Sequence, residues 1–499
     1  MLLVSFLFLR RKVKLKISKG FFVFILAIIV FQFSFFGLKY FVTMDDNNQM
    51  GVYHLRSDDI GGDVISRYKS YDVRPFAFIF DAYVFSWFWD NMYALLILMI
   101  VFHVANLYLT YKICKKIGVN LSGFCICLFA LCPILVEAIY WISASTRIVF
   151  SLFLCLSSIY LLLKSFDETN DCKRLVCFYS AILLNLICVG FYEQVIALNL
   201  FLFIFVMICL KKYKYIWIPI TSTVWIGIWY VYFMMHGEMQ ARGALNISGM
   251  FGTAINCVKM IFKNYVNAYS NFIYSLGFGK EAMLGSLVTI LIAILFIAFI
   301  VYVYKKKVNV TEKCNILRKI IFALIWIIVP FLPFIVLDTK FIAVRNLYFC
   351  TFGIAILFEV LVDYLLLIFK NDNAKNMIKT AVLAFITFFF IISNVDGVNN
   401  YGKVNLVDEK VTRQIIQNVP NEAFEEGKSI SINYDANELF KYKNLSLFVE
   451  STVESDWATI GKIQVMRKST SVPTIYINSN QDKADYVLYF DGQMNLVKN

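Results

Sequence analysis

Charged residues are scarce in this chain of 499 residues. Asp, Glu, Lys and Arg together make up 16% of the sequence, whereas hydrophobic residues make up 60% and the mean hydropathy is +0.68. Soluble globular domains carry about 25% charged residues. The composition therefore excludes an ordinary soluble protein and indicates that a lipid bilayer surrounds most of the chain.

The sequence also lacks the short motifs of common soluble enzymes. It contains no G-x-S-x-G nucleophile elbow, no phosphate-binding P-loop, no H-E-x-x-H zinc motif and no dinucleotide-binding fingerprint. Its 12 Cys all lie at or before Cys350, form no C-x-x-C pair and are typical of buried thiols rather than disulfides or metal ligands. No metal site is predicted, and any cofactor remains unknown.

Apolar runs recur through the first four fifths of the chain. A span requires about 20 apolar residues, because the hydrocarbon core is about 30 Å thick and a helix rises about 1.5 Å per residue. The sequence therefore predicts an all-α polytopic membrane protein with about eleven transmembrane helices. The eleven runs are residues 21–42, 92–111, 119–135, 147–164, 175–191, 194–210, 215–235, 282–304, 320–337, 346–369 and 378–394.

The loops between these runs differ in basic residues. With the N-terminus placed in the cytoplasm, the inner loops hold 24 Lys and Arg and the outer loops hold 11. Positive charge in short loops resists translocation, so this asymmetry predicts a cytoplasmic N-terminus and an extracytoplasmic C-terminus. The net charge of +13 is explained by these loops, and no nucleic-acid partner is expected.

Three regions follow from this topology. Residues 1–20 form a basic cytoplasmic N-terminus without a signal-peptide cleavage site, and residues 21–394 form the transmembrane domain. Within that domain, residues 43–91 form an acidic outer loop. Residues 395–499 have an ordinary soluble composition and are expected to form an extracytoplasmic α/β domain.

The expected C-terminal domain shows both helical and strand patterns. Residues 409–419 have helical spacing, whereas Ser429–Asn433, residues 474–478 and Tyr486–Phe490 alternate apolar and polar side chains as half-buried strands do. Residues 255–265 also have helical spacing, which fits either an interfacial amphipathic helix or a packed helix in an ordered loop.

Two adjacent carboxylates follow the first apolar run directly. Asp45 and Asp46 are thereby placed at the outer membrane edge, where burial or the like-charged neighbour can shift a pKa. A carboxylate in this position can act as a general base. The alternative is that both are solvated residues at the end of a helix.

Three arginines are expected at the same edge. Arg74, Arg147 and Arg345 lie close to the outer ends of predicted spans. Guanidinium groups bind phosphate or pyrophosphate bidentately, which favours an anion-binding role for the three together. Each taken singly can instead snorkel to lipid headgroups or pair with an acidic residue such as Glu137 or Asp338.

Other polar and aromatic residues lie at the outer turns. Glu137 and Glu193 occupy turns where a charge needs a partner or a water-filled cavity, and Trp141 is either an interfacial anchor or a sugar platform. His103 and Asn106 share one face of the second span, where hydrogen bonds between helices are the simpler role.

These residues belong to six short motifs. Their order and placement resemble the GT-C superfamily of polytopic glycosyltransferases, in the branch of bacterial O-antigen glucosyltransferases and O-mannosyltransferases. The motifs are MDD at 44–46, YDVRP at 71–75, FHVANL at 102–107, the segment 132–147 that begins CPILVEAIYWIS, GFYE at 190–193 and VRNLY at 344–348. The resemblance covers residues 21–370.

The resemblance implies roles for several residues. It implies that Asp45 or Asp46 is the catalytic base of an inverting transfer. It makes Arg74, Arg147 and Arg345 candidates for binding the carrier phosphate. The residues implied for substrate contacts are Glu137, Trp141, Glu193 and Tyr348.

Two departures from the family pattern are visible. The TPR tail of the eukaryotic members is replaced by the small α/β domain, which removes them as a guide to the acceptor. Thr110 stands where a second histidine is common in this branch. Neither departure affects the outer carboxylates.

The sequence thus predicts a glycosyltransferase of the bacterial inner membrane. Its partners would be a polyprenyl-phosphate sugar donor, a glycan or lipid-linked saccharide acceptor, and the membrane lipids. Two alternatives are a polysaccharide polymerase or ligase and a lipid-linked sugar flippase or other transporter. Transporters often contain inverted repeats, and none is visible in this sequence.

Overall fold

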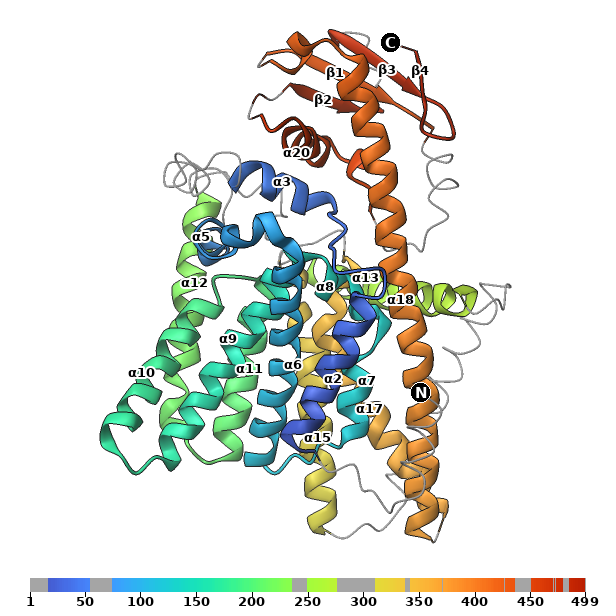
Figure 1. Ribbon diagram of the computed structural model, residues 1–499. Coiled ribbons are helices and arrows are strands. Elements are labelled where there is room, and N and C mark those ends of the chain that lie inside the picture. Colours follow the sequence, from blue (N-terminus) through green and yellow to red (C-terminus); the bar gives the residue numbers. More distant parts are fainter. Residues whose placement is uncertain are drawn as a thin grey trace.

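The computed structural model is a helical bundle with a small sheet at one end (Figure 1). We call that end, where α3 and α5 lie, the sheet end. The structure describes residues 17–53, 74–235, 249–275, 310–336, 342–369, 371–425, 427–435, 450–469, 471, 473–478 and 484–498.

The described helices and helical turns pack mainly around one apolar core. Those up to Met235 are α2 (Lys19–Phe33), α3 (Met44–Tyr53), α5 (Pro75–Tyr83), η2 (Phe85–Asn91), α6 (Met92–Lys116), α7 (Gly123–Ala130), η3 (Pro133–Leu135), α8 (Val136–Tyr140), α9 (Ile142–Asp167), α10 (Asp171–Cys188), α11 (Glu193–Cys209), η4 (Tyr213–Tyr215) and α12 (Trp217–Met235). The later ones are α13 (Met250–Ser275), α15 (Val310–Ile328), η6 (Val329–Phe331), α16 (Leu332–Val336), η7 (Val344–Leu347), α17 (Tyr348–Leu365), η8 (Leu366–Ile368) and α18 (Asp372–Asn418).

Long apolar helices make this a membrane-embedded protein. In the described ranges, five helical stretches are long and apolar enough to cross a bilayer, or six if the bent pair of α7 with η3 and α8 is one span. The five are Phe85–Lys116, Ile142–Asp167, Ile316–Val336, Val344–Ile368 and Asp372–Asn418. Among the residues that the structure describes, the expectation of eleven spans is therefore wrong as a count of full-length apolar helices.

The difference has physical causes that vary from run to run. Helices α2 and α11 are apolar but have only 15 and 17 residues. Helix α10 begins with Asp171, Lys173 and Arg174, which lower its hydropathy. The run at 282–304 lies outside the described residues.

The run at 119–135 is broken at Pro133. Cys132 is extended, and Pro133 opens the short turn η3, because proline lacks an N–H and restricts the residue before it. The two helical pieces meet at an angle of 47°. The break places Glu137 and Trp141 at the turn that leads into α9.

Buried polar side chains join helices inside the bundle. Asn185 Nδ2 donates to Asn199 Oδ1 at 2.9 Å, and Ser222 Oγ donates to Asn185 Oδ1 at 2.7 Å. All three side chains are buried. These hydrogen bonds connect α10, α11 and α12, as expected where lipid offers polar groups no partner.

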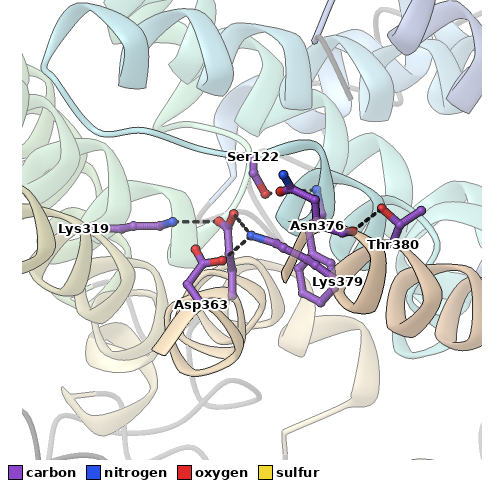
Figure 2. A network of polar contacts seen from close by, with 8 residues as sticks. Ser122, Lys319, Asp363, Asn376, Lys379 and Thr380 are labelled. Atoms are coloured by element: carbon purple, nitrogen blue, oxygen red, sulfur yellow. Dashed lines mark hydrogen bonds and ion pairs between the residues drawn. The ribbon is translucent and has the colours of Figure 1, made fainter. Parts of the chain in front are cut away.

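A second polar network lies at the end of the bundle away from the sheet (Figure 2). Buried Glu359 of α17 accepts from Lys319 of α15 at 2.8 Å and from Lys379 of α18 at 3.3 Å. Lys379 also donates to Asp363 at 2.5 Å. The network therefore fixes three helices to one another.

Helix α13 lies across the bundle rather than along it (Figure 1). It confirms the helix expected from the spacing of residues 255–265. Phe251, Val258 and Phe262 are exposed on it, whereas Tyr265 contacts the bundle through Thr351 Oγ1 at 2.7 Å. The helix is thus packed on one side and carries exposed apolar side chains on another.

The C-terminal unit is joined to the bundle by α18, a single helix of 47 residues (Figure 1). Residues 409–419, expected as a separate helix, fall largely within its last turns, and the expected boundary at residue 395 falls inside it. The remaining elements are η9 (Asn421–Phe424), β1 (Ser429–Asn433), η10 (Thr452–Glu454), α20 (Asp456–Arg467), β2 (Thr474–Ile477), β3 (Tyr486–Phe490) and β4 (Leu496–Lys498).

The four strands form one sheet in the order β2-β1-β3-β4. Strand β1 pairs in parallel with both β2 and β3, and β3 pairs with β4 in antiparallel fashion. Ile430, Ile432 and Leu488 are buried in a second apolar core together with Val411 and Ile415 of α18. The three strands expected from alternation are confirmed, and β4 is an addition.

Candidate functional site

Asp46 anchors α3 to the bundle. Its Oδ1 accepts from the backbone N–H of Ser143 at 2.8 Å and from the Ser143 hydroxyl, and its Oδ2 accepts from the hydroxyls of Tyr40 and Thr43. The residue is completely buried. Both oxygens are thus occupied by donors, two of them from the first turn of α9.

The environment of Asp46 changes its acidity. Burial raises the pKa of Asp46 to about 6, and the hydrogen bonds from Ser143 and Tyr40 act in the opposite direction. The pKa of this carboxyl group, which lies outside the spans, is thereby closer to neutral pH than that of an ordinary aspartate.

The adjacent carboxylate has a different environment. Asp45 is half-buried in the first turn of α3 and lies within electrostatic range of Arg345. The sequence does not distinguish the two acidic residues, but the structure shows that they differ in solvent exposure. Asp45 keeps part of its surface open, whereas Asp46 is enclosed.

Arg345, Glu137 and Trp141 form one cluster at the sheet end. Arg345 Nη1 donates to Glu137 Oε1 at 2.7 Å, and the guanidinium carbon lies 4.3 Å from the centre of a Trp141 ring. The Arg345 side chain is 24% exposed, whereas that of Glu137 is 6% exposed. Glu450, from the C-terminal unit, lies within electrostatic range of Arg345 and Glu137.

A second ion pair is formed by Arg74 and Glu193. Arg74 Nε and Nη2 donate to the two oxygens of Glu193 at 2.9 and 2.8 Å, and the guanidinium stacks over the Tyr192 ring at 4.6 Å. The Arg74 side chain is 20% exposed. This bidentate geometry is the strongest form of such a pair.

The position of α5 explains why Arg74 reaches Glu193. The N–H of Phe76 donates to the carbonyl of Gly190 at 3.1 Å, and a Cβ at Gly190 would lie 2.5 Å from the Phe76 ring. Only glycine permits this approach. The first turn of α5 thus sits on the turn between α10 and α11.

The two ion pairs are connected by hydrogen bonds. Asn346, the neighbour of Arg345, donates through Nδ2 to the hydroxyl of Tyr192, which lies under Arg74. Gln194 Nε2 donates to the Asn346 carbonyl at 3.0 Å. The structure therefore brings Arg74, Arg345 and their partners into one network.

Arg147 has a different set of contacts. Its guanidinium forms a bidentate pair with Asp81 of α5, in which Nη1 donates at 2.9 Å, and Nη1 also donates to Thr146 Oγ1 at 2.8 Å. Arg147 and Asp81 are both buried. We therefore regard Arg147 as a residue that joins α5 to α9, in place of the expected role in phosphate binding.

Tyr348 is also placed away from solvent. It is completely buried, and its hydroxyl lies 2.7 Å from Nδ1 of His103. Asn106 Nδ2 donates to the Val149 carbonyl at 2.9 Å. These contacts are hydrogen bonds between helices, so the expected substrate contact of Tyr348 gains no support from its position.

Two buried donors near the Arg345 cluster were not recognised as such in the sequence. The Trp141 Nε1 and Tyr401 hydroxyl groups have no hydrogen-bond partner among the described residues. The Tyr401 ring lies 4.7 Å from that of Tyr140 and within electrostatic range of Glu137 and Arg345. Unpaired buried donors are uncommon and often mark a bound water or ligand.

Tyr401 has no sequence signal, because it lies within α18 and belongs to none of the six motifs. Metal ligation gains no support either, since the described side chains contain no group of three or more His, Cys, Asp or Glu arranged around a common point.

The site therefore combines a half-buried carboxylate, two partly exposed arginines and two unpaired donors. Comparisons of the chain with protein-family models, with curated proteins and with solved structures find no match.

Proposed function

We propose that this protein is a membrane glycosyltransferase that takes its sugar from a polyprenyl-phosphate carrier. The observation that carries the proposal is the placement of Asp45 within electrostatic range of the partly exposed Arg345, in a network that also contains Arg74. A carboxylate beside cationic groups suits a reaction in which a proton is taken up and a phosphate leaves.

In the proposed reaction, Asp45 accepts the proton of an acceptor hydroxyl. The hydroxyl oxygen then forms a bond to the anomeric carbon of the donor sugar, and the bond from that carbon to the carrier phosphate breaks. The electron pair of the broken bond stays on the phosphate, next to Arg345. Arg74 is linked to the neighbour of Arg345 through Tyr192 and Asn346, and it is the second guanidinium group that we propose to share the charge.

Asp46 has a positioning role in this scheme. Its two oxygens are occupied by Tyr40, Thr43 and Ser143, so no lone pair faces an incoming hydroxyl. It holds the first turn of α3 against α9 and so fixes Asp45 next to it. The proposed base is therefore Asp45.

The distribution of charge supports an outward orientation of the sheet end. Several helices have an end on the side opposite the sheet (Figure 1), and basic residues lie at these ends or within a few turns of them. They are Lys112, Lys115, Lys116, Lys164, Lys173, Arg174, Lys211, Lys212, Lys214, Arg318, Lys319, Lys375 and Lys379. Basic ends of this kind face the cytoplasm. We infer that the site and the C-terminal unit face the other side, as on the bacterial inner membrane, where polyprenyl carriers deliver sugars.

A transfer assay tests the proposal. Purified protein in lipid nanodiscs is mixed with undecaprenyl-phosphate monosaccharides and a membrane glycan extract, and release of undecaprenyl phosphate is followed. We expect Asp45→Asn to lower the rate by about 10²- to 10⁴-fold, the usual contribution of a general base. Asp90→Asn, at an exposed position of the same end, is the matched control and should leave the rate unchanged. An Asp45→Asn protein with the wild-type rate would refute the proposed base.

A further inference from the structure

We infer that the C-terminal unit positions the proposed base, Asp45, because its helix α20 packs against α3. Helix α20 of that unit lies against α3, between the sheet and the bundle (Figure 1). The consequence for catalysis rests on the proposed function, whereas the contact itself does not. The C-terminal unit would then contribute to the geometry of the site, rather than being a separate domain attached to the bundle.

The contact is made by backbone against backbone at Gly461. A Cβ at this position would lie 2.6 Å from both Cα and N of Asn48 and 2.8 Å from the carbonyl carbon of Asn47. Real Cβ atoms do not approach backbone atoms so closely, so any side chain here must displace one of the two helices. Asn47 is two residues from Asp45, within the same turn of α3.

Hydrogen bonds lock the two helices beside this contact. Asn47 Nδ2 donates to Thr452 Oγ1 at 3.1 Å, and both residues are buried. The Thr459 hydroxyl of α20 donates to the Thr452 carbonyl at 2.9 Å. A polar chain thus runs from α20 through residue 452 to α3.

The same segment is fixed to α18. Asp408 accepts from the backbone N–H of Thr452 at 3.1 Å and from the hydroxyl of Ser451, and it is completely buried. Lys462 Nζ of α20 donates to Asn405 Oδ1 at 3.2 Å. Because α18 continues unbroken into the bundle, the position of α20 is set by the bundle itself.

Helix α18 also contacts the chain that precedes α3. A Cβ at Gly402 would lie 3.0 Å from the Phe41 ring, and the neighbouring Tyr401 ring packs on Tyr140. The N–H of Phe41 donates to the Tyr140 hydroxyl at 3.0 Å. Helix α3 is therefore fixed at its start by α18 and α8, and along its length by α20.

The unit also brings charge to the site. Glu450 directly precedes Ser451 and lies within electrostatic range of Arg345 and Glu137. The segment that binds α3 thus also adds a carboxylate beside the cluster that would receive the leaving phosphate. The contact of the C-terminal unit with α3 and the position of Glu450 beside Arg345 therefore depend on the same segment.

A pair of glycine substitutions tests the inference in the full-length protein. Gly461→Ala places a methyl group against the backbone of α3, whereas Gly252→Ala adds the same group to α13, where a Cβ meets nothing within 4 Å. Amide hydrogen exchange of residues 44–53 is measured for wild type and both variants in nanodiscs. We expect faster exchange in Gly461→Ala alone, by about tenfold or more, because the contact that protects α3 is displaced.

The transfer assay gives the second measurement. We expect kcat of Gly461→Ala to fall by about 10²-fold with donor KM within about twofold of wild type, because a small misplacement of a base affects the chemical step. Thr452→Val removes the acceptor for Asn47 and a hydroxyl that also contacts Asp408. It should show both effects in weaker form, and it guards against a Gly461→Ala protein that fails to fold.

The outcomes are distinguishable. Unchanged exchange at residues 44–53 in both Gly461→Ala and Thr452→Val would overturn the inference. Faster exchange with an unchanged kcat would overturn the positioning role. A wild-type protein without transferase activity would overturn the proposed function, while the exchange data would still decide whether α20 holds α3.

Discussion

At the scale of single residues, the main result is that two adjacent carboxylates have different environments. Asp46 is enclosed by hydroxyl and amide donors, whereas Asp45 is half-buried within electrostatic range of Arg345. A sequence can place both at a membrane edge, because they follow an apolar run. It cannot separate them, since the partner Ser143 lies 97 residues away.

The raised pKa of Asp46 predicts a pH dependence of stability. With a pKa of about 6 when folded and about 3.9 when unfolded, the folded protein binds more protons between these values. The contribution of Asp46 to the free energy of unfolding is therefore greatest below about pH 4, falls by about 3 kcal/mol as the pH rises to about 6, and is constant above that.

Asp46→Asn should remove this fall. The measurement is chemical unfolding in detergent micelles between pH 4 and 7, for wild type and the variant, with Asp90→Asn as the control for an exposed carboxylate. Equal slopes for wild type and Asp46→Asn across this range would contradict the buried, ionisable environment assigned to Asp46.

At the scale of elements, α3, α5, α9 and α11 are held together at the sheet end by polar contacts between residues that lie far apart in the sequence. Arg147 and Asp81 fasten α9 to α5, Arg74 and Glu193 fasten α5 to α11, and Asp46 fastens α3 to α9. Each pair buries charge at the sheet end, where it fixes the helices around the proposed site. The Arg147–Asp81 pair is structural even though an arginine near an outer helix end resembles a ligand-binding group.

Breaking the Arg147–Asp81 pair from one side should be costly. We expect Arg147→Met to lower the free energy of unfolding by about 3–5 kcal/mol, because Asp81 keeps a buried charge without its guanidinium partner. The double variant Arg147→Met/Asp81→Leu should recover most of that loss. Urea or dodecyl-sulfate unfolding in micelles measures both, and a double variant no more stable than Arg147→Met would count against the pair.

The sequence predicted local elements better than their connections. Period-two alternation of apolar and polar residues predicts β1, β2 and β3, although the central strand β1 is buried on both faces. The sequence predicts too many spans, because an apolar run shows neither how long the helix in it is, as for α2 and α11, nor how sharply the chain bends, as at Pro133. The continuous α18 was also missed, since its polar C-terminal half resembles the start of a separate domain.

The candidate site was predicted in part for similar reasons. The placement of Asp45, Arg74, Glu137, Glu193 and Arg345 at one end follows from their positions at helix ends. Pairing of an arginine with Glu137 was one of the alternatives that composition left open. The Asp81 partner of Arg147 and the unpaired hydroxyl of Tyr401 depend on packing between distant segments, which the sequence does not display.

At the scale of the whole molecule, the helical bundle and the C-terminal α/β unit are joined by α18 and by the contact of α20 with α3. The acidic helix α3, helix α5 and the sheet lie at one end (Figure 1), whereas the basic residues named above lie at or near the helix ends opposite the sheet. The proposed polyprenyl-phosphate donor and the proposed base can meet only if the sheet end is on the side to which such a carrier delivers its sugar. The orientation of the protein in the membrane therefore decides whether the proposed reaction is possible.

Labelling of two thiols at opposite ends of the molecule measures the orientation of the protein in the membrane. Cys172 is an exposed free thiol at the start of α10, and Asn421→Cys adds one at an exposed position of the C-terminal unit. Spheroplasts are treated with a membrane-impermeant maleimide, and the two labelled peptides are quantified by mass spectrometry. We expect labelling at position 421 in intact spheroplasts and at Cys172 only after permeabilisation. Labelling of Cys172 alone in intact spheroplasts would contradict the proposed orientation.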